Sequence, residues 1–327
     1  MQFAIFHSVK LTKLVACAGL VALLSCSGDE NPTPVPPGSP PQEIALAGAS
    51  VMIGAGDIAV CGTNGDEATG AIVDSVVRVD SVARVTTVVF TIGDNAYPSG
   101  SGGVEKDFQR CFAGSWGKDR IMKLIRPSPG NHDYDSGSLA PYFAFFGDRA
   151  GPAGKGYYSY DVGGWHAIAL NSEVYFESND PSEAKAQEDW LRKDLAEHRS
   201  LCALAYFHRP LFSSGTYGPA SEVLGLWRIL FAGHVDLVLN GHEHDYERFL
   251  PQTPLGVADS INGIEEIIAG TGGGVLRMVR YPVARNSAAQ IHGHFGVLKL
   301  ILGTGEYSHA FIDTNGRVWD PSGRKCH

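Results

Sequence analysis

Residues 87–97 read TVVFTIGDNAY, and this stretch decides the fold class. Its opening TVVFTI is an apolar run rich in β-branched side chains, which is typical of a buried strand. The run ends directly in Gly93-Asp94, and Tyr97 follows. In α/β proteins, ligands bind beyond the carboxyl ends of the strands, so a polar cluster at this point indicates a functional loop.

Further apolar runs follow the same pattern, because each of them finishes in a polar cluster. They are residues 50–53, 165–170, 201–207 and 235–239. Segments with helical periodicity lie between them, so strands and helices alternate along the chain. This alternation predicts an α/β fold in which the polar clusters, scattered in sequence, converge in space.

Two segments have the period of amphipathic helices. In residues 72–83, apolar side chains recur at helical spacing while charged residues take the other faces. In residues 182–198, Ser182 is the expected N-cap. The apolar series is Ile72, Val76, Val79 and Ala83 in the first helix, and the side chains expected to point inward are Trp190, Leu191 and Leu195 in the second.

The polar clusters are rich in Asp, Asn, His and Tyr, which supply the oxygen and nitrogen ligands of hard or borderline metal ions. One cluster alone is weak evidence, since a Gly-Asp pair is usually a turn and a lone histidine is usually structural. A series of them in one chain is hard to explain as turns. The clusters are Gly56-Asp57, Gly93-Asp94-Asn95-Ala96-Tyr97, Gly130-Asn131-His132-Asp133, Ala205-Tyr206-Phe207-His208 and Gly241-His242-Glu243-His244.

The order GD…GDxxY…GNHD…xxxH…GHxH resembles that of the calcineurin-like metallophosphoesterases, and Tyr97 places the chain nearest the purple acid phosphatases. The resemblance covers roughly residues 50–275 and, more loosely, the C-terminal hairpins. It implies an αββα sandwich, in which two facing mixed sheets are flanked by helices.

The resemblance also implies a dinuclear metal centre. Many relatives carry a histidine where this chain has Ala59, and Tyr97 would supply the missing ligand. A phenolate suits Fe(III), whereas an Asn/His/His set suits Fe(II), Zn²⁺ or Mn²⁺. By resemblance, the first metal is bound by Asp57, Tyr97 and His244, the second by Asn131, His208 and His242, and Asp94 bridges both.

The activity implied is hydrolysis of phosphate monoesters by a metal-bridged hydroxide, as in acid phosphatases. By resemblance, His132 contacts the phosphate and protonates the leaving oxygen. Asp133 either orients His132 or serves the loop structure. Plant purple acid phosphatases carry further histidines about ten residues after the His208 equivalent. Ser213, Ser214 and Tyr217 occupy that stretch here, which leaves the general acid and the pH optimum open.

Two other functions remain as alternatives. The same metals could act on phosphodiesters or nucleotides, because the pocket walls decide between these substrates. A degenerate fold used only for binding would have lost ligands, whereas this chain keeps the full set.

Several other polar residues are expected to be structural. His166 is interpreted as a packed histidine, and His292 and His294 are not preceded by a strand-like run. Glu243 is expected either to contact the predicted ligands without binding metal or to face solvent. The pair Glu265-Glu266 is expected to be solvent-exposed at the start of a strand. Residues 270–274 are interpreted as a glycine-rich turn.

Residues 1–26 have the pattern of an export signal. Lys10 and Lys13 precede an apolar run too short to span a bilayer. Leu23-Leu24-Ser25-Cys26 resembles a bacterial lipobox, in which lipid is attached to Cys26, and plain secretion is the alternative. The residue after Cys26 is not aspartate, which by resemblance favours the outer membrane.

A proline-rich linker, residues 27–43, follows the signal and is expected to act as a semi-rigid tether. The catalytic domain is expected to comprise residues 44–327. The formal charge of −9 argues against nucleic-acid binding, which needs a basic surface. By resemblance, small phosphorylated substrates are the expected partners, with membrane contact only through the lipid. The sequence does not indicate an oligomeric state.

Four cysteines besides Cys26 remain after the signal, which suggests two disulfides in an exported chain. Composition alone leaves three pairings open. Cys61 and Cys111 both follow predicted metal loops, so we expect them to pair. Cys202 opens a strand and Cys326 is the penultimate residue, so their bridge would tie the C-terminus to the sheet.

Overall fold

Two β-sheets lie face to face in the computed structural model, which describes residues 48–97, 106–134, 138–198 and 202–327. The signal, Cys26 and the whole linker of residues 27–43 lie outside the described residues, so the interpretations of them stay predictions. The first sheet has six strands in the order β13-β12-β11-β1-β2-β3. These are β1 (Ser50–Ala55), β2 (Thr87–Ile92), β3 (Ile125–Ser128), β11 (Gly296–Gly303), β12 (Glu306–Asp313) and β13 (Val318–Lys325).

The second sheet has seven strands in the order β10-β8-β9-β7-β6-β5-β4. Both sheets are mixed: β1, β2 and β3 run parallel, as do β5, β6, β7 and β9. The remaining strands, β11, β12 and β13 in the first sheet and β4, β8 and β10 in the second, pair antiparallel. The strands are β4 (Tyr158–Val162), β5 (Trp165–Ala169), β6 (Cys202–Tyr206), β7 (Leu237–Asn240), β8 (Tyr246–Gln252), β9 (Ile264–Ala269) and β10 (Ser287–Ile291).

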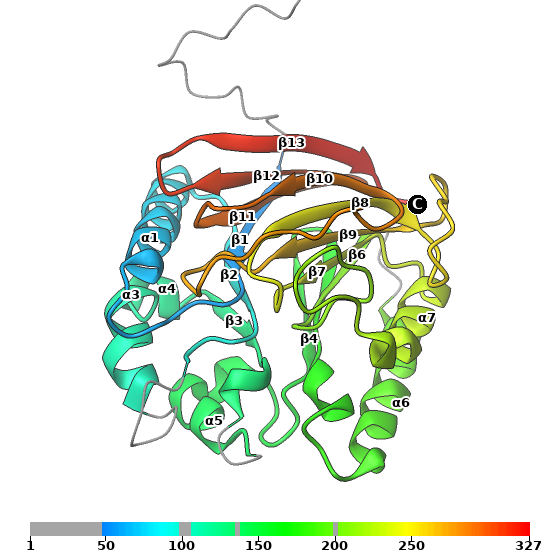
Figure 1. The fold of residues 1–327 in the computed structure, drawn as a ribbon, viewed down its shortest axis with the longest axis horizontal. Helices are drawn as coiled ribbons and strands as arrows, with labels where there is room; N and C mark the ends of the chain where they lie inside the picture. Colours follow the sequence, from blue (N-terminus) through cyan, green and yellow to red (C-terminus); the bar gives the residue numbers. More distant parts are fainter. Residues whose placement is uncertain (1–47, 98–105, 135–137, 199–201) are drawn as a thin grey trace, which may run out of the picture. The chain divides into compact units, whose positions relative to one another are not determined.

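Helices cover the outer face of each sheet (Figure 1). The first sheet is flanked by α1 (Gly65–Ala83), α3 (Ala113–Ser115), α4 (Asp119–Met122) and α5 (Ala140–Phe146), and the second by α6 (Pro181–Glu197) and α7 (Leu224–Ala232). Short helical turns complete the described chain: η1 (Phe108–Phe112), η2 (Asn131–Asp133), η3 (Gly147–Ala150), η4 (Ser172–Tyr175) and η5 (Ser221–Val223).

The buried side chains form three apolar layers that correspond to this arrangement. Phe90, Tyr206 and Leu298 belong to the layer between the sheets. A second layer joins the first sheet to α1 and α5, and a third joins the second sheet to α6 and α7. Each fully buried large apolar side chain contributes about 1.5–3 kcal/mol. The αββα sandwich expected from the sequence is confirmed.

The inward face of α1 differs from the expected one. Val73 and Val77 are buried, whereas Val79 is 57% exposed. Gly70 lies on the buried face, where a Cβ would come within 2.9 Å of the Ser115 carbonyl oxygen. The expected stripe and the stripe of Val73 and Val77 fit the helical period equally well. The close approach at Gly70 decides between them, because it turns the side of α1 that carries Val73 and Val77 toward the protein interior.

The cap of α6 and the surroundings of Glu265-Glu266 also differ from expectation. Asp180, not Ser182, is the N-cap of α6, and its side chain accepts from the Ser182 backbone N–H at 2.8 Å. Aspartate before a proline at the first helical position is a favoured start. Glu265 and Glu266 are buried rather than solvated, because Tyr307, Arg248 and backbone N–H groups bond to them.

Both expected disulfides are present, and the pairing is confirmed. Cys61 bonds to Cys111 and Cys202 to Cys326, with Cα–Cα distances of 5.3 and 5.4 Å. Bridges of this kind typically contribute about 2–4 kcal/mol each. No described helix has both the length and the apolar character needed to cross a membrane.

Candidate dinuclear metal centre

The loops that follow β1 and β2 run side by side. The backbone N–H of Asp57 donates to the Gly93 carbonyl oxygen at 3.1 Å, and that of Tyr97 donates to the Ala59 carbonyl oxygen at 2.9 Å. Tyr97 therefore lies next to the backbone of Ala59, the position at which the resemblance led us to expect a replacement ligand. Parallel strands that end at one edge bring the two polar clusters into contact.

Asp57, Tyr97 and His244 form the first group of predicted ligands. The Tyr97 hydroxyl donates to Asp57 Oδ1 at 2.8 Å. His244 Nε2 lies 3.2 Å from the Tyr97 oxygen and 3.3 Å from Asp57 Oδ1. The other ring nitrogen, Nδ1, lies 2.7 Å from the Val275 carbonyl oxygen, to which it must donate. In neutral His244, Nε2 therefore presents a lone pair to the group.

The second group is centred on His208 at the end of β6. His208 Nε2 lies 3.2 Å from Asn131 Oδ1, 3.2 Å from His242 Nδ1 and 3.4 Å from Asp94 Oδ1. His208 Nδ1 donates to the Ile92 carbonyl oxygen at 2.9 Å, so in the neutral ring Nε2 carries no proton and presents a lone pair. The group thus gathers the His208 lone pair and the oxygens of Asn131 and Asp94 around one point, with His242 Nδ1 beside them.

Asp94 connects the two groups. Ligand atoms of Asp57, Asp94 and His208 all lie within 4.8 Å of one another. Asp94 is buried, and its Oδ1 also accepts from the His132 backbone N–H at 2.8 Å. The structure therefore brings the seven predicted ligands together in the two groups implied by the resemblance. Their role as ligands stays a prediction.

The chemistry of these atoms fits metal ions. Burial alone would lower the pKa of His208, but the carboxylates of Asp94 and Asp57 raise it to about 10. A proton on Nε2 could satisfy only one of the two oxygen acceptors near it, Asn131 Oδ1 and Asp94 Oδ1, whereas a metal ion would satisfy both together. Burial, and then the charges of Asp57 and Asp94, raise the pKa of Tyr97 well above its usual value. A phenolate there would require a cation beside it.

The backbone at the centre is strained. Asp57, Asp94 and His242 have positive φ angles of 59°, 48° and 69°. Non-glycine residues rarely adopt this conformation, and such strain costs of order 1–3 kcal/mol each and is concentrated at functional sites. Gly93 has a φ of 76°, and a Cβ there would meet the His208 ring at 2.6 Å. The turns expected from the glycines are thus made partly by the predicted ligands themselves.

His132 and Asp133 have different surroundings. The His132 side chain is 44% exposed, its Nε2 lies 3.9 Å from Asp94 Oδ2, and its ring centroid lies 4.5 Å from that of Tyr97. The buried Asp133 carboxylate accepts from the Asn95 and Gly130 backbone N–H groups at 3.0 and 2.8 Å. Within the described chain, none of its hydrogen bonds goes to His132. Asp133 therefore holds the two ligand loops together, which is the structural role that the sequence left open.

The charged pair of Arg209 and Glu173 lies beside the centre and could not be identified from the sequence. Arg209 Nε donates to both oxygens of the buried Glu173, at 2.8 and 3.1 Å, and Arg209 Nη1 lies 3.2 Å from His242 Nε2. Glu243 is buried, not solvent-exposed, and accepts from the Tyr217 and Gly218 backbone N–H groups. The sequence left open whether Glu243 supports the predicted ligands or faces solvent, and its burial excludes the second alternative.

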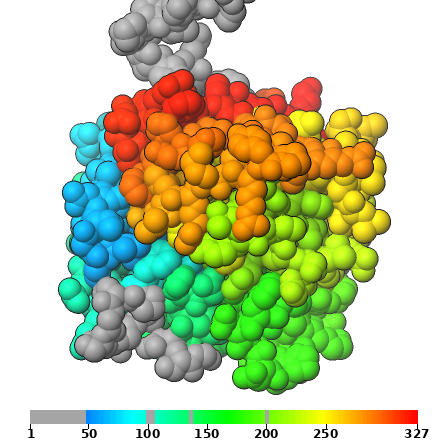
Figure 2. Space-filling model, in the orientation of Figure 1, coloured from blue at the N-terminus to red at the C-terminus, as the bar shows by residue number. Residues whose placement is uncertain are grey.

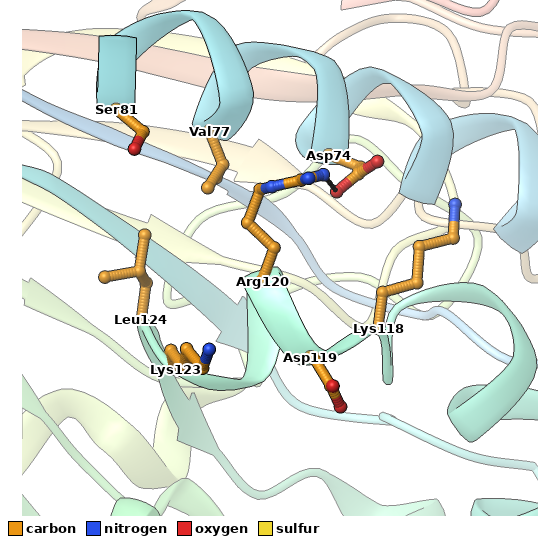
Figure 3. Close-up of a pocket in the computed structure, with 8 residues that line it drawn as sticks. All are labelled: Asp74, Val77, Ser81, Lys118, Asp119, Arg120, Lys123 and Leu124. Carbon is orange, nitrogen blue, oxygen red and sulfur yellow. Dashed lines mark hydrogen bonds and ion pairs between the residues drawn. The ribbon is translucent and has the colours of Figure 1, made fainter.

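Other polar clusters and hollows lie apart from these groups. His166 is buried between Asp161 and Asp194, with ring nitrogens 2.9 and 2.8 Å from their oxygens, which agrees with a structural role. A surface hollow between α1 and α4 is lined by none of the predicted site residues, and its Arg120 is paired with Asp74 at 2.6 Å (Figure 3).

Comparisons with known proteins identify the family of the chain. The profile of the calcineurin-like phosphoesterase family matches residues 54–246. Acid phosphatase type 7 from Homo sapiens is 28% identical over 204 residues, covering 53% of this chain and 43% of the relative. Purple acid phosphatase 15 from Arabidopsis thaliana is 34% identical over 112 residues, covering 32% and 20%. The chain thus matches less than half the length of these relatives.

A solved structure shows the same fold. Purple acid phosphatase PPD1 from yellow lupin seeds aligns with a TM-score of 0.69 and 20% identity, covering 85% of this chain and 54% of that one. At this identity the likeness concerns the fold alone. The family profile, in contrast, spans the clusters from Asp57 to His244 that form both groups of predicted ligands. The chain therefore belongs to the calcineurin-like phosphoesterase family.

Proposed function

We propose that this protein is a metal-dependent phosphoric ester hydrolase that acts on phosphate monoesters at a dinuclear centre. The observation that carries the proposal is the convergence of acceptor atoms in two adjoining groups, with Asp94 between them. Acceptors gathered in this way, with the outer nitrogens of His208 and His244 held by backbone carbonyls, are typical of catalytic metal sites.

The two groups suit different ions. The Tyr97 group offers a phenol, a carboxylate and an imidazole, and suits Fe(III). The His208 group offers an amide oxygen and two imidazoles, and suits Fe(II), Zn²⁺ or Mn²⁺. Bound there, two ions would supply a water of lowered pKa and positive charge for the phosphoryl oxygens.

Other residues of the chain would position the substrate and the ligands and supply a proton to the leaving group. His132 is an accessible imidazole beside the predicted ligands, and we assign to it the binding of a phosphoryl oxygen and the protonation of the leaving oxygen. Arg209 holds the outer nitrogen of His242 and is itself fixed by Glu173. We regard Arg209, Glu173 and Asp133 as positioning residues.

The first prediction is turnover of phenyl phosphate by the metal-loaded protein. We expect this monoester to be hydrolysed at least about tenfold faster than diphenyl phosphate, and chelation to abolish both activities. Initial rates on the two substrates, before chelation and after metal is restored, provide the measurement. Faster hydrolysis of the diester would favour the phosphodiesterase alternative, and hydrolysis of neither substrate would contradict the proposal.

Export is also part of the proposal. The two disulfides support folding in an oxidising compartment, as expected for an exported protein. We propose that lipid at Cys26 and the linker of residues 27–43 tether the catalytic domain to a bacterial membrane. Small phosphorylated molecules are the proposed substrates.

A further inference from the structure

Two segments form a wall beside the His242 and His244 side of the centre: residues 213–218 and residues 275–284. They are bonded directly to each other, since the Arg280 backbone N–H donates to the Ser214 carbonyl oxygen and the Ala284 backbone N–H to Ser214 Oγ, both at 2.7 Å. Figure 2 shows residues around 280 in orange lying against residues around 215 in lime green. We call these two segments the wall.

The wall is attached to the predicted metal ligands at several points. The Arg277 backbone N–H donates to the His244 carbonyl oxygen at 2.9 Å, and the Val275 carbonyl oxygen accepts from His244 Nδ1. On the other segment, Glu243 accepts from the Tyr217 backbone N–H at 3.0 Å. The wall is therefore held in a fixed position relative to the centre.

Tyr217 connects the centre to the outer part of the wall. Its ring stacks on His242 at 4.7 Å with an interplanar angle of 29°, and it is 51% exposed. The Arg277 guanidinium carbon lies 4.9 Å from the centroid of the Tyr217 ring. Arg277 is thus separated from the predicted ligand His242 by a single aromatic ring.

Arg277 has no acidic partner among the described residues, and its Nε is buried without a hydrogen bond. Other arginines of the described chain have acidic partners: Arg209 is paired with Glu173, and Arg248 with Asp320. An unsatisfied buried donor requires an explanation, and a planar guanidinium is the best protein group for binding a phosphate or carboxylate through paired hydrogen bonds.

We propose that Arg277 binds a second anionic group of the substrate, carried by the leaving group. The proposal rests on the proposed function, and it names as preferred substrates phosphate esters whose alcohol part bears a carboxylate or a further phosphate. The scissile phosphate lies at the metal centre, the leaving group passes over Tyr217, and the second anion reaches the guanidinium. Tyr217 supports the cation through its ring face.

The test compares phenyl phosphate with 4-carboxyphenyl phosphate, which differ only in a distal carboxylate. We expect wild-type protein to favour the carboxylated ester in kcat/KM, and Arg277→Met to reduce that preference about tenfold to a hundredfold. Arg277→Lys should retain part of it, because the charge remains while the paired geometry is lost. Arg285→Met is the matched control, since it removes an exposed arginine next to the wall and should leave the preference unchanged.

A binding measurement separates this inference from the proposed function. Calorimetry with phenylphosphonate and 4-phosphonobenzoate, whose P–C bonds are not hydrolysed, reports the effect of the carboxylate without turnover. Tighter binding of 4-phosphonobenzoate by wild type, lost in Arg277→Met and kept in Arg285→Met, would support the assignment. Equal binding of both phosphonates, or a preference that survives Arg277→Met, would overturn it even if the enzyme is active. Absence of turnover alone would count only against the proposed function.

Discussion

Asp94→Asn is expected to lower phosphomonoester turnover by about a thousandfold or more, and to release at least one of two bound metal ions. Asp94 is the only predicted ligand placed in both groups, and its Oδ1 lies 3.4 Å from His208 Nε2. Loss of a single transition-state donor in an enzyme typically costs about 10²–10³ in rate. Removing a shared anionic ligand should cost more, because it affects both ions.

Asparagine is chosen because it keeps an oxygen that can accept from the His132 backbone N–H, as Asp94 Oδ1 does at 2.8 Å. The fold should therefore persist, which circular dichroism can check, and Asp94→Ala would show the larger loss. Asp74→Asn is the matched control, since Asp74 lies on α1 and pairs with Arg120 away from the centre. Metal analysis and initial rates are the measurements, and full turnover by Asp94→Asn would refute the bridging role.

Tyr97→Phe is expected to remove the visible absorption of the iron-loaded protein. A phenolate transfers charge to Fe(III), so wild type reconstituted with iron should be coloured. The Tyr97 oxygen lies 2.8 Å from Asp57 Oδ1 and 3.2 Å from His244 Nε2, within the group assigned to that ion. Phenylalanine preserves the ring contact with His132 and removes only the oxygen.

The alternative is that Tyr97 is a wall residue and Asp57 and His244 hold the ion without it. Visible spectra and iron content of the two proteins distinguish these cases. Loss of the band with iron still bound would support the phenolate, and a band unchanged by the substitution would rule it out. Tyr217→Phe is the matched control, because Tyr217 stacks on His242 through its ring and should not affect the band.

The parts of the centre that could be predicted are those encoded locally. In residues 87–97 a strand, a glycine and an acidic ligand are contiguous, and His242 and His244 are two residues apart. Parallel strands bring such clusters to one edge, so their convergence also follows from the sequence. The disulfide between Cys61 and Cys111 was predictable for the same reason, since both cysteines follow loops of this edge.

The parts that could not be predicted depend on packing between distant segments. Glu173 meets Arg209 only because η4 follows β5 at the same edge as β6, and the residues are 36 positions apart. Glu266 looked solvated because a glutamate pair in a strand usually faces water, yet the Leu211 and Phe212 backbone N–H groups approach it. On α1, two apolar stripes satisfied the helical period, and the neighbouring helix decided between them.

Metal titration of the stripped protein tests the dinuclear centre most directly. The protein would be freed of metal with a chelator, and metal would be returned in measured amounts while phenyl phosphate turnover and bound metal are followed. We expect turnover to rise until two ions are bound per chain and then to level off, because both groups of ligands are needed. Turnover that levels off at one ion per chain, or that persists in metal-free protein, would contradict a dinuclear phosphoesterase.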